Sequence, residues 1–176
     1  MPNTRTAGRT TATRSRSRKE NDPIELLEAD HRKVEKLFKD FEKKKEKDRE
    51  AAIEVVGQIL LELTVHAQIE EEIFYPTMRE SGGEKMTDLL DEAEVEHASA
   101  KDLIAQISSM SPDEELYDAK VTVLGEYVKH HVKEEEDEIF PKAKKAGVDM
   151  EELGNLLAER KQELMQEMGD GAESAQ

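Results

Sequence analysis

The chain has 176 residues, enough for one domain of ordinary size, and its formal net charge is −16 because 42 acidic side chains outnumber 26 basic ones. It contains no cysteine, which excludes a disulfide framework, an iron–sulfur cluster and a thiol nucleophile. No stretch approaches the roughly 18 uncharged apolar residues that cross a membrane, so we expect no transmembrane helix and no secretory signal. The acid excess disfavours nucleic acid as a partner of the main body.

The two ends of the chain differ in composition from the rest. Residues 1–19 carry six basic side chains and no acidic one, among Thr, Ser, Ala, Gly, Asn and Pro. Because this segment lacks apolar periodicity, we expect residues 1–21 to be a disordered basic tail that contacts polyanions weakly. Its composition also fits an organellar transit peptide. A second short polar tail is expected over 169–176.

Between these ends, caps and turns divide the chain into helices, and no run shows the alternation of a strand. The divisions are Asp22-Pro23, Ser81-Gly82-Gly83, Ser111 to Glu114 (which reads as a capping box) and Gly147 to Asp149. The predicted helices cover 23–46, 49–76, 84–109, 112–140 and 150–167. The fold class is therefore all-α: an up-down-up-down four-helix bundle over 22–145 with a short accessory helix within 146–168. We expect that helix to pack outside the bundle, or to serve as a partner or dimer surface.

Each predicted bundle helix carries an apolar stripe that is interrupted only by His or Glu. The interrupting residues are His31, His66, Glu70, His97, His131 and Glu135. A carboxylate buried without a partner is very costly, and no Lys or Arg lies on these stripes. In an antiparallel bundle, the six groups fall within a layer of roughly 12 Å, at about 1.5 Å per residue. A bound metal cation is the simplest compensation for their charge.

The chain also contains an internal repeat that points to two metal ions. His66 and Glu70 are followed by Tyr75-Pro76, and His131 and Glu135 are followed by Phe140-Pro141, so both copies read H-x3-E-x4-aromatic-P. His31 and His97 are separated by nearly the same number of residues as the two copies of this motif. His and Glu four residues apart share one face of a helix, and Glu can bridge two ions. This set of nitrogen and oxygen ligands favours two iron ions, with manganese or zinc as alternatives.

These motifs resemble the hemerythrin-like (HHE cation-binding) domain. The matching segments are Asp30-His31-Arg32, His66 to Glu70 with Tyr75-Pro76, Glu96-His97, and His131 to Glu135 with Phe140-Pro141. The resemblance covers about residues 22–145. It implies a four-helix bundle with a non-haem di-iron centre that binds oxygen or related small molecules, for storage, sensing or oxidative and nitrosative stress responses.

The sequence departs from the oxygen-carrier pattern near His97. Carriers have a fifth histidine one turn away, whereas the positions four residues on either side here are Ala93 and Lys101. Glu94 could supply an oxygen ligand instead. The fifth histidine of this chain, His130, lies off the stripe and is predicted to be on the surface. This departure favours sensing or redox chemistry over reversible oxygen transport.

We therefore expect a cytoplasmic di-iron protein whose ligand is dioxygen, peroxide or nitric oxide. One ion would take His31 and His66, and the other His97 and His131, with Glu70 and Glu135 bridging. Two alternatives remain open. One is a di-iron enzyme that decomposes peroxide or reduces nitric oxide. The other is a metal-free helical interaction module that works through its basic tail and its C-terminal helix.

Overall fold

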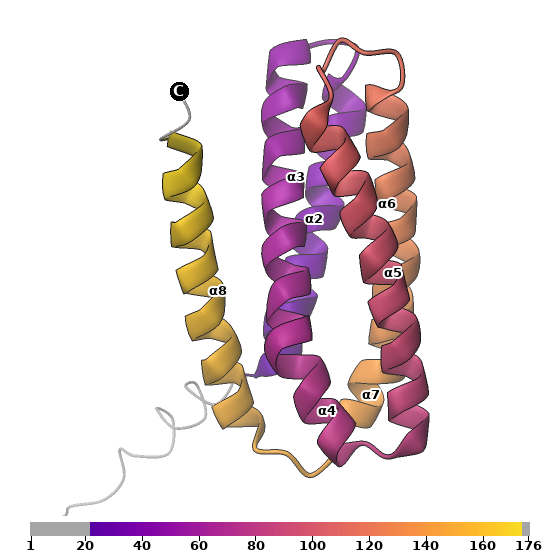
Figure 1. The fold of residues 1–176 in the computed structure, drawn as a ribbon, viewed down its shortest axis with the longest axis vertical. Helices are drawn as coiled ribbons and strands as arrows, with labels where there is room; N and C mark the ends of the chain where they lie inside the picture. The colour runs from indigo at the N-terminus through magenta and orange to yellow at the C-terminus, as the bar shows by residue number, and fades with distance from the viewer. Residues whose placement is uncertain (1–21, 174–176) are drawn as a thin grey trace, which may run out of the picture.

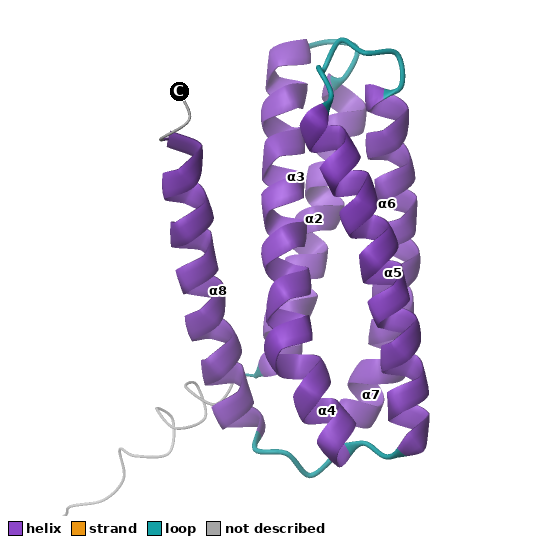
Figure 2. Ribbon diagram, viewed as in Figure 1, coloured by secondary structure: helices purple, strands orange, loops and turns teal. Residues whose placement is uncertain are grey.

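Four long helical segments run alternately up and down, and a fifth helix lies along one side of them (Figure 1). The computed structural model describes residues 22–173, so most of the two predicted tails lies outside the described residues. The described elements are α2 (Pro23–Lys44), α3 (Arg49–Ile69), η1 (Glu70–Phe74), α4 (Tyr75–Ser81), α5 (Glu84–Ser109), α6 (Tyr117–Glu134), η2 (Glu135–Ile139), α7 (Phe140–Ala143) and α8 (Met150–Glu173). Within this range only helices, turns and loops occur (Figure 2). The all-α bundle with an extra C-terminal helix is therefore confirmed.

The helix starts follow from local capping. Asp22 Oδ1 accepts hydrogen bonds from the backbone N–H groups of Ile24 and Glu25, at 2.8 and 3.2 Å, ahead of Pro23 at the first helical position. Asp149 caps α8 in the same way, through the N–H groups of residues 151 and 152 at 3.1 Å each. Gly83 separates α4 from α5 with φ +74°, a left-handed conformation that glycine adopts without strain.

The predicted helix over 112–140 is wrong at its start. Ser111 and Glu114 form one half of a capping box, because Glu114 Oε1 accepts from the Ser111 N–H at 2.6 Å. The following residues nevertheless form turns, and α6 begins only at Tyr117, whose N–H donates to the Glu114 carbonyl at 3.0 Å. The Glu114 N–H donates to the Ser111 backbone carbonyl at 3.0 Å instead of to the Ser111 hydroxyl, so the capping box stays incomplete.

Two short π-helical turns, η1 and η2, lengthen the second and fourth bundle helices. Each begins at a repeat glutamate, and the N–H groups of Tyr75 and Phe140 donate to the carbonyls of Glu70 and Glu135, five residues back. After each turn, one aromatic residue is followed by a proline. A proline inside a regular α-helix clashes with the carbonyl four residues earlier, and the wider turn relieves that clash. Helix α4 therefore continues to Ser81, beyond the predicted end at residue 76.

The buried apolar residues form two clusters, one towards each end of the bundle. The first contains Ile24, Leu27, Phe74, Met86, Leu90 and Phe140 with residues of α8. The second contains Val34, Phe41, Ile59, Ile107, Val121 and Leu124. In all four bundle helices, the predicted His and Glu positions fall between the residues of these clusters. The polar groups therefore form one layer, with apolar packing on both sides.

Helix α8 packs against the outer side of α2 and α3 (Figure 1). Leu153, Leu157 and Leu164 are almost completely buried there, in the same cluster as Val65 and Ile69 of α3. The helix runs to Glu173, so the predicted end near residue 167 and the predicted tail over 169–176 are wrong for residues 168–173. The expectation that it packs outside the bundle is confirmed.

One continuous helical stretch, Arg49–Ser81, is long and apolar enough to cross a membrane by length and composition alone. Packing also explains why this stretch is apolar, because bundle helices cover one side of it and α8 covers the other side. Val56, Ile59, Val65 and Ile69 are all buried in these two contacts. A helix that is covered all round is apolar all round. The cytoplasmic location remains a prediction.

Candidate metal centre

All six predicted side chains meet in the polar layer between the two apolar clusters. They come from six elements: His31 from α2, His66 from α3, Glu70 from η1, His97 from α5, His131 from α6 and Glu135 from η2. Both glutamates have an exposed fraction of 0%, and the four histidines are buried. The six groups therefore lie at one level of the bundle, as the helix lengths predict.

The ring nitrogens and carboxylates form two groups of potential ligands. His31 Nε2 lies 3.1 Å from His66 Nε2 and 3.2 Å from Glu135 Oε2, while His66 Nε2 lies 3.2 Å from Glu70 Oε2. In the other group, His97 Nε2 lies 2.9 Å from His131 Nε2 and 3.5 Å from Glu70 Oε2. Glu70 belongs to both groups, so it can bridge two ions. Glu135 Oε2 also lies 3.4 Å from His131 Nε2, which gives it the same capacity.

The carboxylates at the centre carry oxygens that no described residue satisfies. Both oxygens of Glu70 and Oε2 of Glu135 are buried and accept no hydrogen bond within residues 22–173. An unsatisfied buried oxygen costs free energy, and a buried charge costs more. Four imidazole nitrogens with two carboxylates form a donor set that suits a first-row transition metal. The residues present therefore fit a metal cation.

Each of the four histidines directs its other ring nitrogen, Nδ1, to a carboxylate outside the centre. The partners of His31, His66, His97 and His131 are, in order, Glu136 at 2.9 Å, Asp30 at 3.5 Å, Glu71 at 2.9 Å and Glu96 at 2.8 Å. A carboxylate on Nδ1 fixes the proton on that nitrogen and leaves Nε2 free to bind a metal. This arrangement is typical of metal-binding histidines.

Sequence reasoning missed the role of these four outer carboxylates, although the repeat contained the signal. Asp30 and Glu96 directly precede His31 and His97. Glu71 and Glu136 directly follow the two repeat glutamates. All four therefore repeat with the same approximate two-fold relation as the inner residues. An acidic residue adjacent to four of the six predicted ligands, at matching places in both copies, marks them as candidates, but the sequence does not say which histidine each one contacts.

In the metal-free protein, protons supply the positive charge that the centre needs. Burial lowers the pKa of His66, but Glu70, Asp30 and Glu135 together outweigh it and raise that pKa to about 10. Burial likewise raises the pKa of the Glu135 carboxyl, yet the neighbouring His131, His31 and His66 hold it well below its usual range. The Glu135 carboxyl therefore remains charged. The pKa of His131 is also raised, because Glu135 and Glu96 outweigh its burial, so a metal must displace protons from His66 and His131.

The approximate two-fold symmetry is broken at one buried pair, Tyr75 and Phe140. Phe140 stacks on His31 with the ring centroids 5.7 Å apart, and Tyr75 stacks on His97 at 5.5 Å. Only Tyr75 has a hydroxyl, which donates to Glu135 Oε1 at 2.8 Å. Burial and then the charges of Glu70 and Glu135 raise the pKa of Tyr75 well above its ordinary value, so the phenol stays protonated. Tyr75 therefore makes a hydrogen bond to the centre that Phe140 cannot make.

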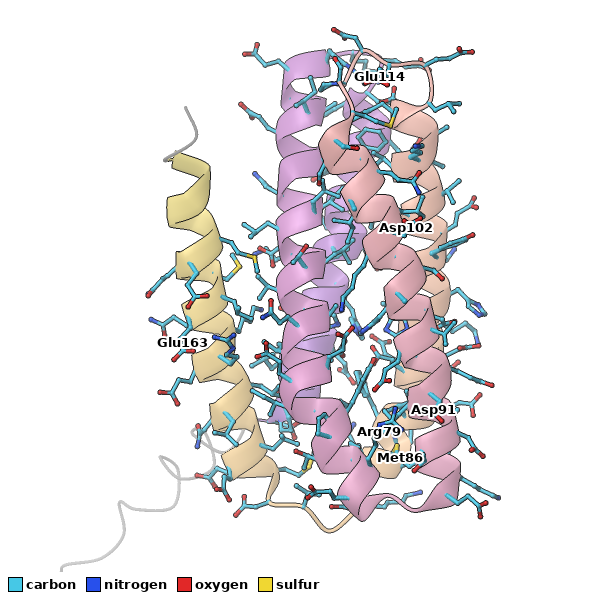
Figure 3. All side chains as sticks on the ribbon, in the orientation of Figure 1. Arg79, Met86, Asp91, Asp102, Glu114 and Glu163 are labelled. Atoms are coloured by element: carbon cyan, nitrogen blue, oxygen red, sulfur yellow. The ribbon has the colours of Figure 1, made fainter. Side chains whose placement is uncertain are left out.

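The structure places three other residues from the sequence analysis outside the ligand groups. Glu94 is half exposed and pairs with Arg79 at 2.9 Å, so it does not supply the missing ligand. Arg79 of α4 also pairs with Asp91 of α5 (Figure 3). Lys101 donates to Glu71 at 2.6 Å. His130 has an exposed fraction of 65%, which confirms its predicted surface position.

A small cavity of about 40 Å³ adjoins the four histidines on the side of the second apolar cluster. Its apolar wall includes Val34, Leu63, Ala100, Ile104 and Val128. A water molecule needs roughly 10–15 Å³ of such space, so the cavity has room for a molecule of two or three heavy atoms. Tyr127, which is half exposed, forms part of the wall near the surface.

This geometry defines a helical bundle with a buried cation-binding centre, and comparison with known proteins agrees. The family model for the hemerythrin HHE cation-binding domain matches residues 22–143. The chain therefore belongs to the hemerythrin HHE cation-binding family. Metal binding follows from membership together with the His and Glu groups described above.

Two known proteins resemble this chain. A solved structure of an HHE cation-binding domain-containing protein from Mycobacterium kansasii superposes with a TM-score of 0.67 at 22% identity, over 81% of this chain and 86% of that one. A protein described as a DNA nickase from Nostoc sp. strain PCC 7120 is 34% identical over 116 residues. That match covers 66% of this chain but only 32% of the relative, so the chain spans about a third of its length.

Proposed function

We propose that this protein holds two iron ions and uses them to bind dioxygen, peroxide or nitric oxide. The observation that carries the proposal is the set of four inward-facing Nε2 atoms around two fully buried carboxylates with unsatisfied oxygens. One ion would take His31 and His66, and the other His97 and His131. Glu70 and Glu135 would bridge them.

The chain itself contributes orientation, charge and exclusion of water. When bound, two iron ions supply the redox chemistry by which such a centre binds or reduces oxygen and nitrogen oxides. The outer carboxylates hold each imidazole ring in place through Nδ1. Tyr75 donates its hydroxyl proton to Glu135 Oε1, which holds this carboxylate in place beside the histidines.

The proposed ligand class is supported by the cavity beside the histidines. Its volume of about 40 Å³ and its apolar wall suit a small uncharged molecule. Larger or strongly charged molecules would have to desolvate against Val34, Leu63 and Ile104, which is unfavourable. Lys101, which lines the same cavity, occupies one of the positions where carriers have a fifth histidine, so we place ligand sensing or redox chemistry above reversible oxygen transport.

Iron quantitation on matched variants tests the ligand assignment. We expect Glu70→Ala and His131→Ala to lower the iron that survives desalting, because each removes a buried ligand. When loading is carried to completion, His130→Ala is the matched control, since it removes an imidazole one residue away that faces solvent. Equal loss in all three variants would refute the assignment, and no iron in the wild type after loading would favour the metal-free interaction module.

Spectroscopy and turnover separate binding from catalysis. The optical spectrum of the iron-loaded wild type should change when oxygen is added, whether or not the change is reversible. The spectrum of His131→Ala should not show this change. Multiple turnovers of peroxide or nitric oxide per chain would favour the enzymatic alternative.

The DNA-cleaving activity named for the Nostoc relative belongs to a protein about three times as long as the matched segment. The acidic body of this chain disfavours DNA contact.

A further inference from the structure

The two copies of the repeat differ at one place on the outside of the centre. Asp30 and Glu96 are equivalent, since each precedes a histidine and accepts a hydrogen bond from the Nδ1 of a ligand histidine. Asp30 is buried, and Lys161 of α8 donates to its other oxygen. Glu96 is partly exposed, and α8 does not cover its side of the bundle. The two equivalent carboxylates therefore meet different surroundings.

The residues that flank Glu96 are polar, whereas those that flank Asp30 are apolar. In the first copy, the repeat places Val65 and Ile69 beside the centre, and both are buried beneath α8. The corresponding positions in the second copy are His130 and Glu134, which are 65% and 38% exposed. Surface exposure alone would allow any polar pair, but these two residues are metal-binding types at the same four-residue spacing as the buried ligands.

We propose that Glu96, His130 and Glu134 form a surface site for a divalent first-row transition cation on its way to the buried centre. His130 Nε2 lies 3.2 Å from Glu134 Oε1 and 3.5 Å from Glu96 Oε1, and all three ligand atoms lie within 4.8 Å of one another. Neighbouring ligands around a tetrahedral ion with bonds of about 2.1 Å are separated by roughly 3.4 Å. The spacing therefore already fits such an ion.

The charges around this surface site also favour a cation. Within residues 22–173, the ion pairs of Glu96 and Glu134 are made with histidines and with neither Lys nor Arg. By contrast, Asp30 pairs with Lys161 and Glu71 pairs with Lys101. The imidazole gives the site a preference for transition metals over Mg²⁺ or Ca²⁺, which require oxygen ligands. Among residues 22–173 the site has three protein ligands, so water completes the coordination and the ion exchanges readily.

Glu96 connects the surface site to the interior. Its Oε1 faces His130, while its Oε2 accepts from His131 Nδ1 at 2.8 Å. Glu96 also lines the cavity that adjoins His97 and His131. A cation held at the surface site is therefore one carboxylate away from the proposed buried ligands. The role in delivery rests on the proposed iron centre, whereas binding at the surface site does not.

Equilibrium dialysis with Mn²⁺ tests the surface site directly. We expect His130→Ala and Glu134→Gln to bind one fewer Mn²⁺ per chain than the wild type, and excess Mg²⁺ not to displace this ion. The matched control is Asp137→Asn, which removes an exposed carboxylate paired with Lys133 on the same helical segment. The full complement of Mn²⁺ in His130→Ala would overturn the site, and so would an equal loss in Asp137→Asn, which would indicate diffuse attraction only.

The delivery role is tested by the rate at which added Fe²⁺ becomes inaccessible to a colorimetric chelator under anaerobic conditions. We expect both surface variants to load about tenfold more slowly than the wild type, because they lose local attraction for the cation, and to reach the same final iron content. An unchanged loading rate would overturn delivery. If the wild type failed to retain buried iron, the proposed function would fail, but the His130-dependent Mn²⁺ would still be detected in dialysis.

Discussion

At the scale of single residues, the centre depends on concentric contacts: buried Nε2 atoms and carboxylates inside, and a carboxylate on each Nδ1 outside. The inner residues were predictable because a charged or imidazole side chain on an apolar stripe violates the pattern of its helix. Three of the four outer carboxylates obey that pattern, since Glu71, Glu96 and Glu136 are all partly or fully exposed, whereas Asp30 is buried. Only the tertiary structure showed that they contact histidines on other helices.

The buried charges predict an unusual pH dependence in the metal-free protein. The folded-state pKa of His66, about 10, lies above the ordinary value of 6.5. The proton on His66 therefore stabilises the fold fully below pH 6.5, and this contribution is lost as the pH rises towards about 10. We expect the urea midpoint of the metal-free protein to fall across that range.

The urea midpoint of the His66→Gln variant should change less over the same pH range. His130→Ala should retain the wild-type slope, because that imidazole faces solvent. A midpoint that is constant or rising in the wild type would contradict the assignment. With metal bound the slope should weaken, since the metal requires neutral histidines.

Tyr75 is the second residue with a specific consequence. In Tyr75→Phe, Glu135 Oε1 loses its donor at 2.8 Å while the ring packing is kept. Hydrogen bonds to charged groups contribute about 1.5–3 kcal/mol, so we expect the free energy of unfolding to fall by that amount in chemical denaturation. The same change at the half-exposed Tyr127 should have almost no effect. Equal stability of the two variants would show that the buried hydrogen bond is unimportant.

At the scale of elements, the π turns determine where the ends of the helices point. Each turn starts at a repeat glutamate and finishes before an aromatic residue and a proline, so it adds a residue to the helix just below the centre. Tyr75 and Phe140 consequently stack on histidines rather than lying further round the helix. The repeat was visible in the sequence, but the change of helix type was not, because it depends on backbone hydrogen bonds around the proline.

Helix α8 offers a test of its packing at this scale. Leu157 is completely buried against the bundle, whereas its neighbour Leu156 has an exposed fraction of 47%. Replacing a buried Leu by Ala costs about 2–5 kcal/mol, so we expect Leu157→Ala to lower the free energy of unfolding by that amount. Leu156→Ala should change it by less than about 0.5 kcal/mol. Similar values for the two variants would mean that α8 does not pack on the bundle in solution.

At the scale of the whole molecule, the polar layer between two apolar clusters couples metal binding to stability. Any ligand that binds only the folded state stabilises it, by about 2.7 kcal/mol at a free concentration one hundred times its dissociation constant. Removing the metal with a chelator should therefore lower the melting temperature, and the loss should be reversed by transition metals but not by Mg²⁺. Glu70→Ala should show a much smaller chelator effect. A melting temperature that is insensitive to chelation would contradict a buried metal centre.

The sequence by itself determined the helices, their order and the six residues at the centre, because helix periodicity and capping are local properties and buried ionisable groups stand out against an apolar stripe. It also pointed to the surface position of His130. Only the tertiary structure decided the role of the outer carboxylates, the hydroxyl contact of Tyr75, the rejection of Glu94 and the uncovered side of the bundle at Glu96. Each of these depends on which helices become neighbours, a relation that no local pattern records. The side covered by α8 and the side left open differ for that reason, although the repeat makes the two halves of the bundle nearly alike.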